Sequence, residues 1–466
     1  MTPTATNIES RNGAEPFCQT ERNEPATSTP LEMSELQSGL LHPRPSPYVG
    51  NYIVFRIDDR RDGRRFVERL GRFVASAAEW SADAKAWLTI TITYQGLRAL
   101  GVPQDSLDSF PPEFREGMAA RADVLGDTGA SAPENWEQPL GSSDVHIALA
   151  AIAPDASRLN VLLDEIESSR RDLAAVTEIW RQECYALPND REAFGFKDGI
   201  SHPAIEGSGI AGSNPKEDPL KAGEFILGYR NELGDITPMP QPDVLGRNGT
   251  YVVFRKLHQN VAAFRQYLRA HAKDVADEEL LAAKFVGRWR SGAPLSLSPD
   301  RDDPELGADA TRNNDFLYKD DDPRGLKCPI GSHIRRMNPR DAVVTGVVRL
   351  HRMIRRGTNY GPHLPEGVLD DDGADRGLCF VFVGASLTRQ FEFVQTQWVN
   401  DGRFISAPAE KDPLVGGSGG QCPFTVPARP IRRRLQGLPT FVTTRGGEYC
   451  FAPSLSALRW IAELTT

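Results

Sequence analysis

The sequence predicts an α+β fold of two ferredoxin-like units, which arose by internal duplication and each form an antiparallel sheet with helices on one face. Residues 50–56 read GNYIVFR, and residues 249–255 repeat them as GTYVVFR after 199 positions. Both copies have the β-branched and aromatic composition of strands. Each is followed by apolar residues at the spacing of an amphipathic helix: Phe66, Leu70 and Phe73 in the first copy, and Phe264, Tyr267 and Leu268 in the second.

The remaining elements complete the same pattern in both halves. Four further segments have strand composition, two in each half: residues 86–94 and 145–152, then residues 343–350 and 379–383. Helical patterns follow two of them, at residues 156–167 and 387–400. Each half therefore reads as β-α-β-β-α-β, the order of a ferredoxin-like unit. We predict one unit over residues 45–240 and the other over residues 241–466.

Residues 1–44 differ in composition from the rest of the chain. They are rich in Ser, Thr, Pro, Glu and Asn and have few large apolar side chains, so burial cannot offset the entropy cost of ordering them. We therefore predict a disordered N-terminal segment, with a partner-binding arm as the alternative. The segment lacks the basic and apolar regions of a secretory signal, which favours a cytoplasmic location.

The overall composition excludes several classes of protein. A hydrophobic content of 39% and a charged content of 25% are typical of a soluble globular protein. The net charge of −9 argues against nucleic-acid binding, and no apolar run approaches the ~18 residues of a membrane helix. The six cysteines are scattered without metal-ligand spacing, so buried thiols are favoured over disulfides or zinc ligands. The composition predicts no oligomeric state.

Three segments carry the candidate chemistry. Residues 194–203 read FGFKDGISHP and hold Asp198 between two glycines, a GxxDG pattern that by itself is most often a turn. Residues 328–340 read CPIGSHIRRMNPR and place His333 in an arginine-rich run. About twenty residues after this histidine, residues 353–357 read MIRRG.

In this order, the three segments resemble the haem-binding halves of dye-decolourising peroxidases. The similarity extends over residues 45–466, and residues 390–395 and 398–400 are similar to the longer, fungal-like branch of that family. The resemblance implies the same pair of ferredoxin-like units. It also implies haem b as the cofactor, hydrogen peroxide as the oxidant, and bulky aromatic donors such as dyes as the reducing substrates.

The resemblance assigns His333 as the iron ligand, because the histidine of the family lies in the same C-P-x-x-x-H-I-R-R context. His202, beside the GxxDG motif, is the main alternative. A ligating imidazole usually donates its second N–H to a carboxylate. Glu392 is similar to the family's acid on this side of the haem, and a solvated helix glutamate is the alternative.

On the other side of the haem, the resemblance assigns Asp198 as base and then acid toward the peroxide. Arg355 would stabilise the developing anion, with Arg356 as the alternative, and together the two residues would form a ferryl intermediate. Asn359 stands where Pro is common in the family, so the geometry of this loop is left open. Since a carboxylate stays charged to lower pH than a histidine, an acidic optimum is expected.

The haem propionates need cationic partners, and arginine pairs with carboxylates in a bidentate way. Arg340, at the end of the histidine motif, is the first candidate by resemblance. Arg335 is the second, and for it a basic face that balances Asp341 is the alternative.

Three functions are possible, and they differ in which of these residues they need. The first is a haem peroxidase that uses hydrogen peroxide, and it needs His333, Asp198 and Arg355. The second is a haem-binding or haem-handling protein with incidental peroxidase activity, which needs only the histidine. The third is a ferredoxin-like binding module without haem. The presence of all three residues favours the enzyme.

Overall fold

The computed structural model describes residues 30–80, 86–344, 347–417, 419–420 and 422–465. The chain divides into residues 1–30 and a body, Leu31–Thr466, and the helices and strands described belong to the body. In the described part of the chain, no helix is both long and apolar enough to span a membrane.

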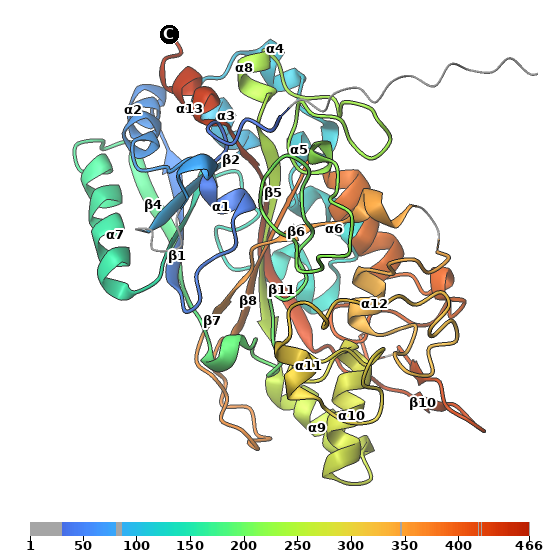
Figure 1. Ribbon diagram of the computed structural model, residues 1–466. Coiled ribbons are helices and arrows are strands. Elements are labelled where there is room, and N and C mark those ends of the chain that lie inside the picture. The colour runs from blue at the N-terminus through green and yellow to red at the C-terminus, as the bar shows by residue number, and fades with distance from the viewer. Residues whose placement is uncertain (1–29, 81–85, 345–346, 418, 421, 466) are drawn as a thin grey trace, which may run out of the picture. The chain divides into compact units, whose positions relative to one another are not determined.

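Among the described residues, nine strands form one antiparallel sheet at the centre of the body (Figure 1). Their order is β4-β1-β3-β2-β11-β5-β8-β6, and β7 also pairs with β8. The strands are β1 (Val49–Ile57), β2 (Trp87–Thr93), β3 (Ile147–Ala153), β4 (Val176–Tyr185), β5 (Thr250–Gln259), β6 (Ile354–Arg355), β7 (Thr358–Tyr360), β8 (Gly377–Gly384) and β11 (Val442–Ala452). A separate two-stranded ribbon pairs β9 (Phe424–Val426) with β10 (Arg433–Leu435).

The strand order reveals the duplication. In the first unit β4, β1, β3 and β2 are neighbours, and in the second β11, β5, β8 and β6 repeat the same order. The two halves join edge to edge where β2 meets β11, through the pairs Thr93–Cys450 and Ile92–Phe451. The predicted α+β fold of two ferredoxin-like units is confirmed, and their sheets are continuous.

The seven repeated residues are out of register with this duplication. Tyr52 and Val54 of β1 pack with Phe254 of β5 in one hydrophobic cluster. Their sequence counterparts, Tyr251 and Val253, belong instead to the cluster that includes the helices of the first unit. Because side chains alternate between the two faces of a strand, the two copies place matching residues on opposite faces.

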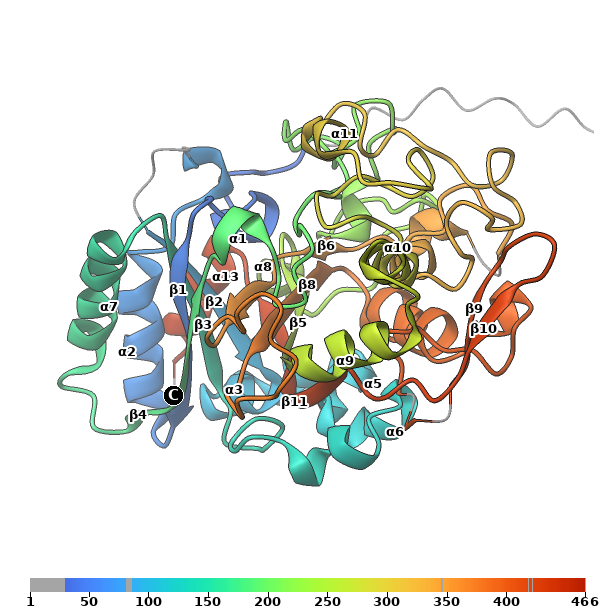
Figure 2. The same ribbon diagram turned by 90° about the horizontal axis from the view of Figure 1, so that it is seen from below.

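Helices cover one face of the first unit. Figure 2 shows α2 and α7 together on one side of its strands. Asp59 caps α2 by accepting from the N–H groups of Arg61 and Asp62, and Phe66 and Leu70 of that helix are fully buried in the core.

The helices are α1 (Ser38–Leu41), α2 (Arg60–Gly71), α3 (Tyr94–Ala99), α4 (Gln104–Asp108), α5 (Pro112–Glu116), α6 (Ala122–Leu125), α7 (Ala156–Arg170), α8 (Asp243–Gly246), α9 (Val261–His271), α10 (Val275–Val286), α11 (Pro304–Ala308), α12 (His333–Met337) and α13 (Leu455–Ala462). The helix expected at 387–400 is present as two π-helical stretches, η8 (Leu387–Glu392) and η9 (Val394–Val399).

The part of the N-terminal segment that the structure describes is packed, contrary to the prediction. Residues 1–29 lie outside the described residues, but residues 31–44 pack onto the body. Leu36 and Leu40 are buried there. Gln37 is fully buried as well, and its amide donates to the carbonyls of Ile90 and Pro453 at 2.9 Å each. The prediction of disorder is therefore wrong for residues 31–44. Burial of the leucines and the two hydrogen bonds of the Gln37 amide hold these residues against the rest of the body.

The strand predicted at 343–350 is also absent from the described residues. Val343 and Val347 are 86% and 56% exposed, and Val348–His351 form a 3₁₀ turn. The edge of β8 pairs instead with the short strands β6 and β7. β-branched composition alone does not make a strand when the sheet edge is already occupied.

Candidate functional site

A cavity of about 440 Å³ collects residues from all three motifs. Asp198, His333, Arg340 and Arg355 line it. The other walls are largely apolar and come from β5, β8, β11 and the η8–η9 helix: Leu257, Leu378, Phe380, Phe391, Val394 and Val442. Of the six predicted site residues, Glu392 and Arg335 are not part of the lining.

His333 begins α12 and has a buried carboxylate next to its ring. Its Nδ1 lies 2.9 Å from Oδ2 of Asp412, whose side chain is fully buried. The other carboxylate oxygen accepts from the N–H groups of Leu414 and Val415. Burial raises the pKa of Asp412, but His333 and Arg336 outweigh it, so the pKa lies below its usual value. Nδ1 thus donates to a charged carboxylate, and among the described residues Nε2 has no hydrogen-bond partner.

Glu392 does not occupy this position. Its carboxylate accepts from both arms of the Arg121 guanidinium and, at 2.9 Å, from the hydroxyl of Tyr449. The prediction that Glu392 supports the ligating histidine is wrong, because its carboxylate is bonded to Arg121 and Tyr449 instead. Asp412 takes that place. It lies 79 residues after His333 in the chain, in a segment where no local pattern marks it.

Arg336 joins α12 to the segment that carries Asp412. The side chain is fully buried, and a buried guanidinium needs acceptors for its donors. It finds four backbone carbonyls, those of Gly331, Trp398, Asp401 and Glu410. These bonds set the position of the Asp412 segment relative to His333.

Asp198 lies in a loop whose glycines are required by geometry. Gly195 and Gly199 have φ of +97° and +75°, in the region that residues with a Cβ rarely adopt. A Cβ on Gly195 would also lie 2.7 Å from the guanidinium of Arg290. The N–H of Asp198 donates to the carbonyl of Asp190 at 3.0 Å. The motif is therefore a turn, and the turn presents a cavity-lining carboxylate.

Two arginines act on the Asp198 carboxylate. Nη2 of Arg44 lies 3.9 Å from its Oδ2, and Arg355 of β6 lines the same cavity. Burial raises the pKa of Asp198, but Arg355 and then Arg44 outweigh it, so the pKa lies below its ordinary value. Sequence reasoning missed Arg44, since it belongs to the segment predicted to be disordered.

The two alternative residues are not part of the cavity lining. Burial, followed by the charges of Arg356 and Arg355, lowers the pKa of His202 to about 3, so this imidazole is neutral. Arg356 donates to the carbonyls of Leu41 and Arg355. The cavity therefore favours His333 over His202 and Arg355 over Arg356.

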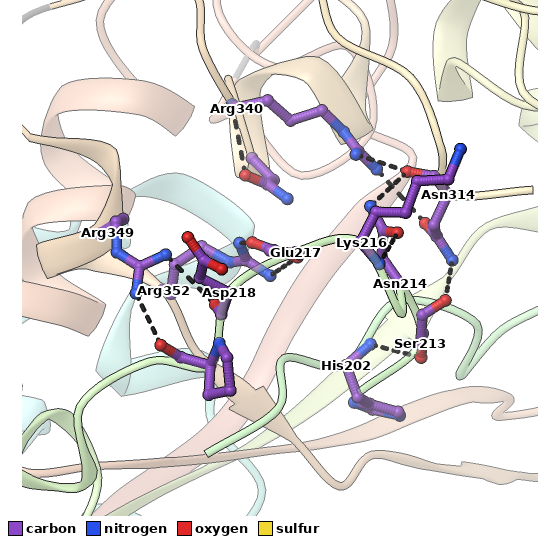
Figure 3. Close-up of polar contacts among 12 residues, drawn as sticks. His202, Ser213, Asn214, Lys216, Glu217, Asp218, Asn314, Arg340, Arg349 and Arg352 are labelled. Carbon is purple, nitrogen blue, oxygen red and sulfur yellow. Dashed lines mark hydrogen bonds and ion pairs between the residues drawn. The ribbon is translucent and has the colours of Figure 1, made fainter. Parts of the chain in front are cut away.

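Arg340 lines the cavity from a strained backbone, with φ of +56°. Its guanidinium donates to the carbonyls of Asn314 and Phe316 at 2.8 and 3.0 Å and lies 3.7 Å from the Phe316 ring centre. Figure 3 shows the hydrogen bonds of Arg340 to Asn314 and, in the same view, the ion pair of Arg352 with Glu217. Among the described residues no carboxylate pairs with Arg340, so it can accept an anionic group of a ligand.

Arg335 has a different role from the one predicted. It is 4% exposed, and it pairs with the Asp322 carboxylate at 3.0 Å and donates to the Cys328 carbonyl at 2.8 Å. Its guanidinium also lies 4.2 Å from the ring centre of Tyr318. The prediction of a propionate contact at Arg335 is wrong, because Asp322 already occupies its fork.

The donors of the cavity fit a haem. Among the described residues, no group of three His, Cys, Asp or Glu side chains could hold a metal ion. The cavity offers one imidazole with a free Nε2, apolar walls for a flat macrocycle, and an unpaired arginine for a propionate.

The chain is similar to known peroxidases. It is 35% identical over 413 residues to a dye-decolorizing peroxidase of Mycena epipterygia, covering 80% of this chain and 76% of that protein. A fungal DyP-type peroxidase structure from Auricularia auricula-judae matches with a TM-score of 0.80 at 28% identity, covering 93% of this chain and 100% of that one. A dye-decolorizing peroxidase in complex with 2,6-dimethoxyphenol matches with a TM-score of 0.80 at 27% identity and the same coverage. No family model matches the chain.

Proposed function

Because the chain belongs to the dye-decolourising peroxidase family and is a peroxidase, we propose that it binds haem b and uses hydrogen peroxide to oxidise bulky aromatic donors. One observation supports this most directly. A single cavity is lined by His333, which has Asp412 as its carboxylate partner, and by the two residues Asp198 and Arg355.

The residues on the His333 side would bind and tune the cofactor. Nε2 of His333 would ligate haem, which supplies the redox chemistry of its iron when bound, and Arg340 would contact a propionate. Asp412 accepts the Nδ1–H of His333 and so fixes the tautomer and makes the imidazole a stronger donor.

The residues on the peroxide side would move a proton and stabilise charge. Asp198 accepts the proton of the bound peroxide and then returns it to the leaving oxygen. Arg355 donates hydrogen bonds to the negative charge that develops on the peroxide. Because the pKa of Asp198 is lowered, the carboxylate remains a base in mildly acidic solution, and the rate falls once the pH drops below that pKa.

The reducing substrates are proposed from the relatives. One of them was solved with 2,6-dimethoxyphenol, and others are named for dyes, so phenols and dyes are the donors to test here. The cytoplasmic location and the unit boundary between residues 240 and 241 stay predictions.

Replacing the proposed iron ligand tests the cofactor site. His333→Ala is expected to lose haem or to bind it with a changed Soret band, while His202→Ala, the matched control, keeps the wild-type spectrum. Full haem occupancy with an unchanged spectrum in His333→Ala would move the ligand to another residue.

Turnover separates the enzyme from a haem-handling protein. A peroxidase needs Asp198 and Arg355, so Asp198→Asn and Arg355→Leu should both keep haem and slow the reaction with peroxide. If both variants react with peroxide at the wild-type rate, the peroxidase activity does not depend on a built site and is incidental to haem binding.

A further inference from the structure

The residues just before β1 contact the peroxide side of the cavity. We call residues 42–48 the N-terminal strap. Arg44 in the strap pairs with Asp198 at 3.9 Å, and its guanidinium lies 4.8 Å from the ring centre of Tyr48. Among the described residues, Asp198 is the carboxylate with which Arg44 forms an ion pair.

Two further contacts fix the strap to the loop that carries Asp198 and to β7, the strand that follows Arg355. The Ser46 hydroxyl donates to the carboxylate of Asp190, whose carbonyl in turn accepts from the N–H of Asp198. At the end of the strap, the Tyr48 hydroxyl accepts from the N–H of Asn359 at 2.8 Å. Asn359 lies four residues after Arg355 in the chain. The strap is thus hydrogen-bonded to the Asp198 loop through Asp190 and to β7 through Asn359.

We propose that Arg44 is a positioning residue of the peroxidase, which holds the Asp198 carboxylate in place and in its charged form. This rests on the proposed role of Asp198 as the base. Arg355 then contacts the peroxide, while Arg44 acts on the reaction through Asp198. Together with Arg355, the charge of Arg44 then sets the lowest pH at which the site works.

The charges around Asp198 support this division of roles. The groups that face it are two cations and three others: Arg355 and Arg44, then His202, Tyr48 and Glu192. The histidine is neutral because burial, above all, lowers its pKa to about 3. Burial raises the pKa of the tyrosine to about 12 and raises the pKa of the glutamate. The two arginines are therefore the charged groups that stabilise the carboxylate, and the N–H of Gly199 adds a hydrogen bond to it.

The pH profile of the holoenzyme tests the proposal. An arginine next to an aspartate lowers its pKa by about 1–3 units, so Arg44→Leu should move the acidic limb of the peroxide reaction up by about one pH unit. Above the limb the rate should fall much less than in Asp198→Asn, and Arg44→Lys should restore the wild-type limb. Arg247→Leu is the matched control, since Arg247 pairs with Glu32 of the N-terminal segment at 2.6 Å and does not line the cavity.

Two results would overturn the proposal. One is an unchanged acidic limb in Arg44→Leu. The other is an equal loss of rate at every pH in Arg44→Leu and Arg247→Leu, because the strap would then only contribute to packing.

A second measurement does not depend on peroxide turnover. Thermal unfolding of the full chain should show that Arg44→Leu lowers the midpoint more when Asp198 is present than in the Asp198→Asn background. Because the folded-state pKa of Asp198 is lowered, this coupling is present at neutral pH and disappears as the pH falls through that pKa. If the coupling between Arg44 and Asp198 is found but the wild-type protein does not react with peroxide, the ion pair is real and the proposed peroxidase function is wrong. An absence of coupling would overturn the role of Arg44.

Discussion

The two ferredoxin-like units have the same strand order but differ in what their sheets support. In the first unit, the second strand along the chain is β2, which has seven residues. The sheet of this unit packs with α2 and α7 in one hydrophobic core. In the second, the corresponding strand is β6, which consists of Ile354 and Arg355. Strands β5, β8 and β11 line the cavity there. Two duplicated units can thus keep the same strand order while one of them has a cavity where the other has a packed core.

The largest effect on activity is expected from Asp198→Asn. General acid–base help contributes about 10²–10⁴ in rate, and an amide cannot accept the peroxide proton. The reaction should slow by that factor and lose its acidic limb, as measured by stopped-flow spectroscopy between about pH 3 and pH 7. A wild-type rate throughout would assign the proton transfer to water or another group and leave Asp198 as the acid of a glycine-bounded turn.

Arg355→Leu should have the next largest effect. Loss of one donor to a developing anion costs about 10²–10³ in rate. Because Arg355 also lowers the pKa of Asp198, the acidic limb should move to higher pH in this variant as well. Arg356→Leu is the matched control, since that guanidinium donates to backbone carbonyls. If the control slows the peroxide reaction and Arg355→Leu does not, the two assignments are exchanged.

Asp412→Asn should have a smaller effect, on the cofactor rather than on the proton. Loss of the acid behind a ligating histidine typically weakens metal binding by about 10–100-fold. A less basic imidazole also stabilises ferric iron less, so the Fe(III)/Fe(II) potential should rise. Spectroelectrochemistry and haem titration measure both quantities. Glu392→Gln is the control and should change neither, since Glu392 pairs with Arg121 and Tyr449. The reverse pattern would restore Glu392 as the supporting acid.

Phe55→Ala should have the smallest effect on the site and a large one on stability. Phe55 is fully buried in the first unit, with its ring centre 5.0 Å from that of Phe66. Truncating such a side chain costs about 3–5 kcal/mol, which denaturant unfolding would measure. The peroxide rate per folded molecule should stay the same. Leu378→Ala, on the cavity wall of the second unit, should change the haem spectrum instead. Equal effects of the two variants on the spectrum would contradict the division between the units.

Local motifs predicted four of the residues that line the cavity, although Arg335, in the same motif as His333, is not among them. Asp198, His333, Arg340 and Arg355 are each part of a recognisable segment, and all four line the cavity. At Asp198 the glycines that form the turn also identify the cavity-lining carboxylate.

Residues that reach the site from a distance could not be predicted. Asp412 meets His333 only because Arg336 binds the intervening carbonyls. Arg44 meets Asp198 only because Leu36 and Leu40 anchor a segment with a disordered composition. Such contacts depend on tertiary packing, which no local spacing encodes.

The order of predicted strands and helices was a better guide to the fold than the seven repeated residues. The seven-residue match indicated a duplication that the strand order confirms, although matching residues face opposite sides of the sheet. The prediction of a strand at 343–350 was wrong, because in the part of the chain that the structure describes Val343 and Val347 pair with no strand. Composition therefore identified candidates, and the available sheet edges decided among them.

The packing of α13 has a consequence for synthesis on the ribosome. This last helix of the chain places Leu458 and Ile461 in the core of the first unit, and the Leu464 carbonyl just beyond it accepts from Arg64 of α2. Domains made first usually fold first as they emerge. Here the core of the first unit includes side chains of α13, so it can close only after residues 455–462 have been synthesised. A nascent chain that stops early exposes the apolar side of α2.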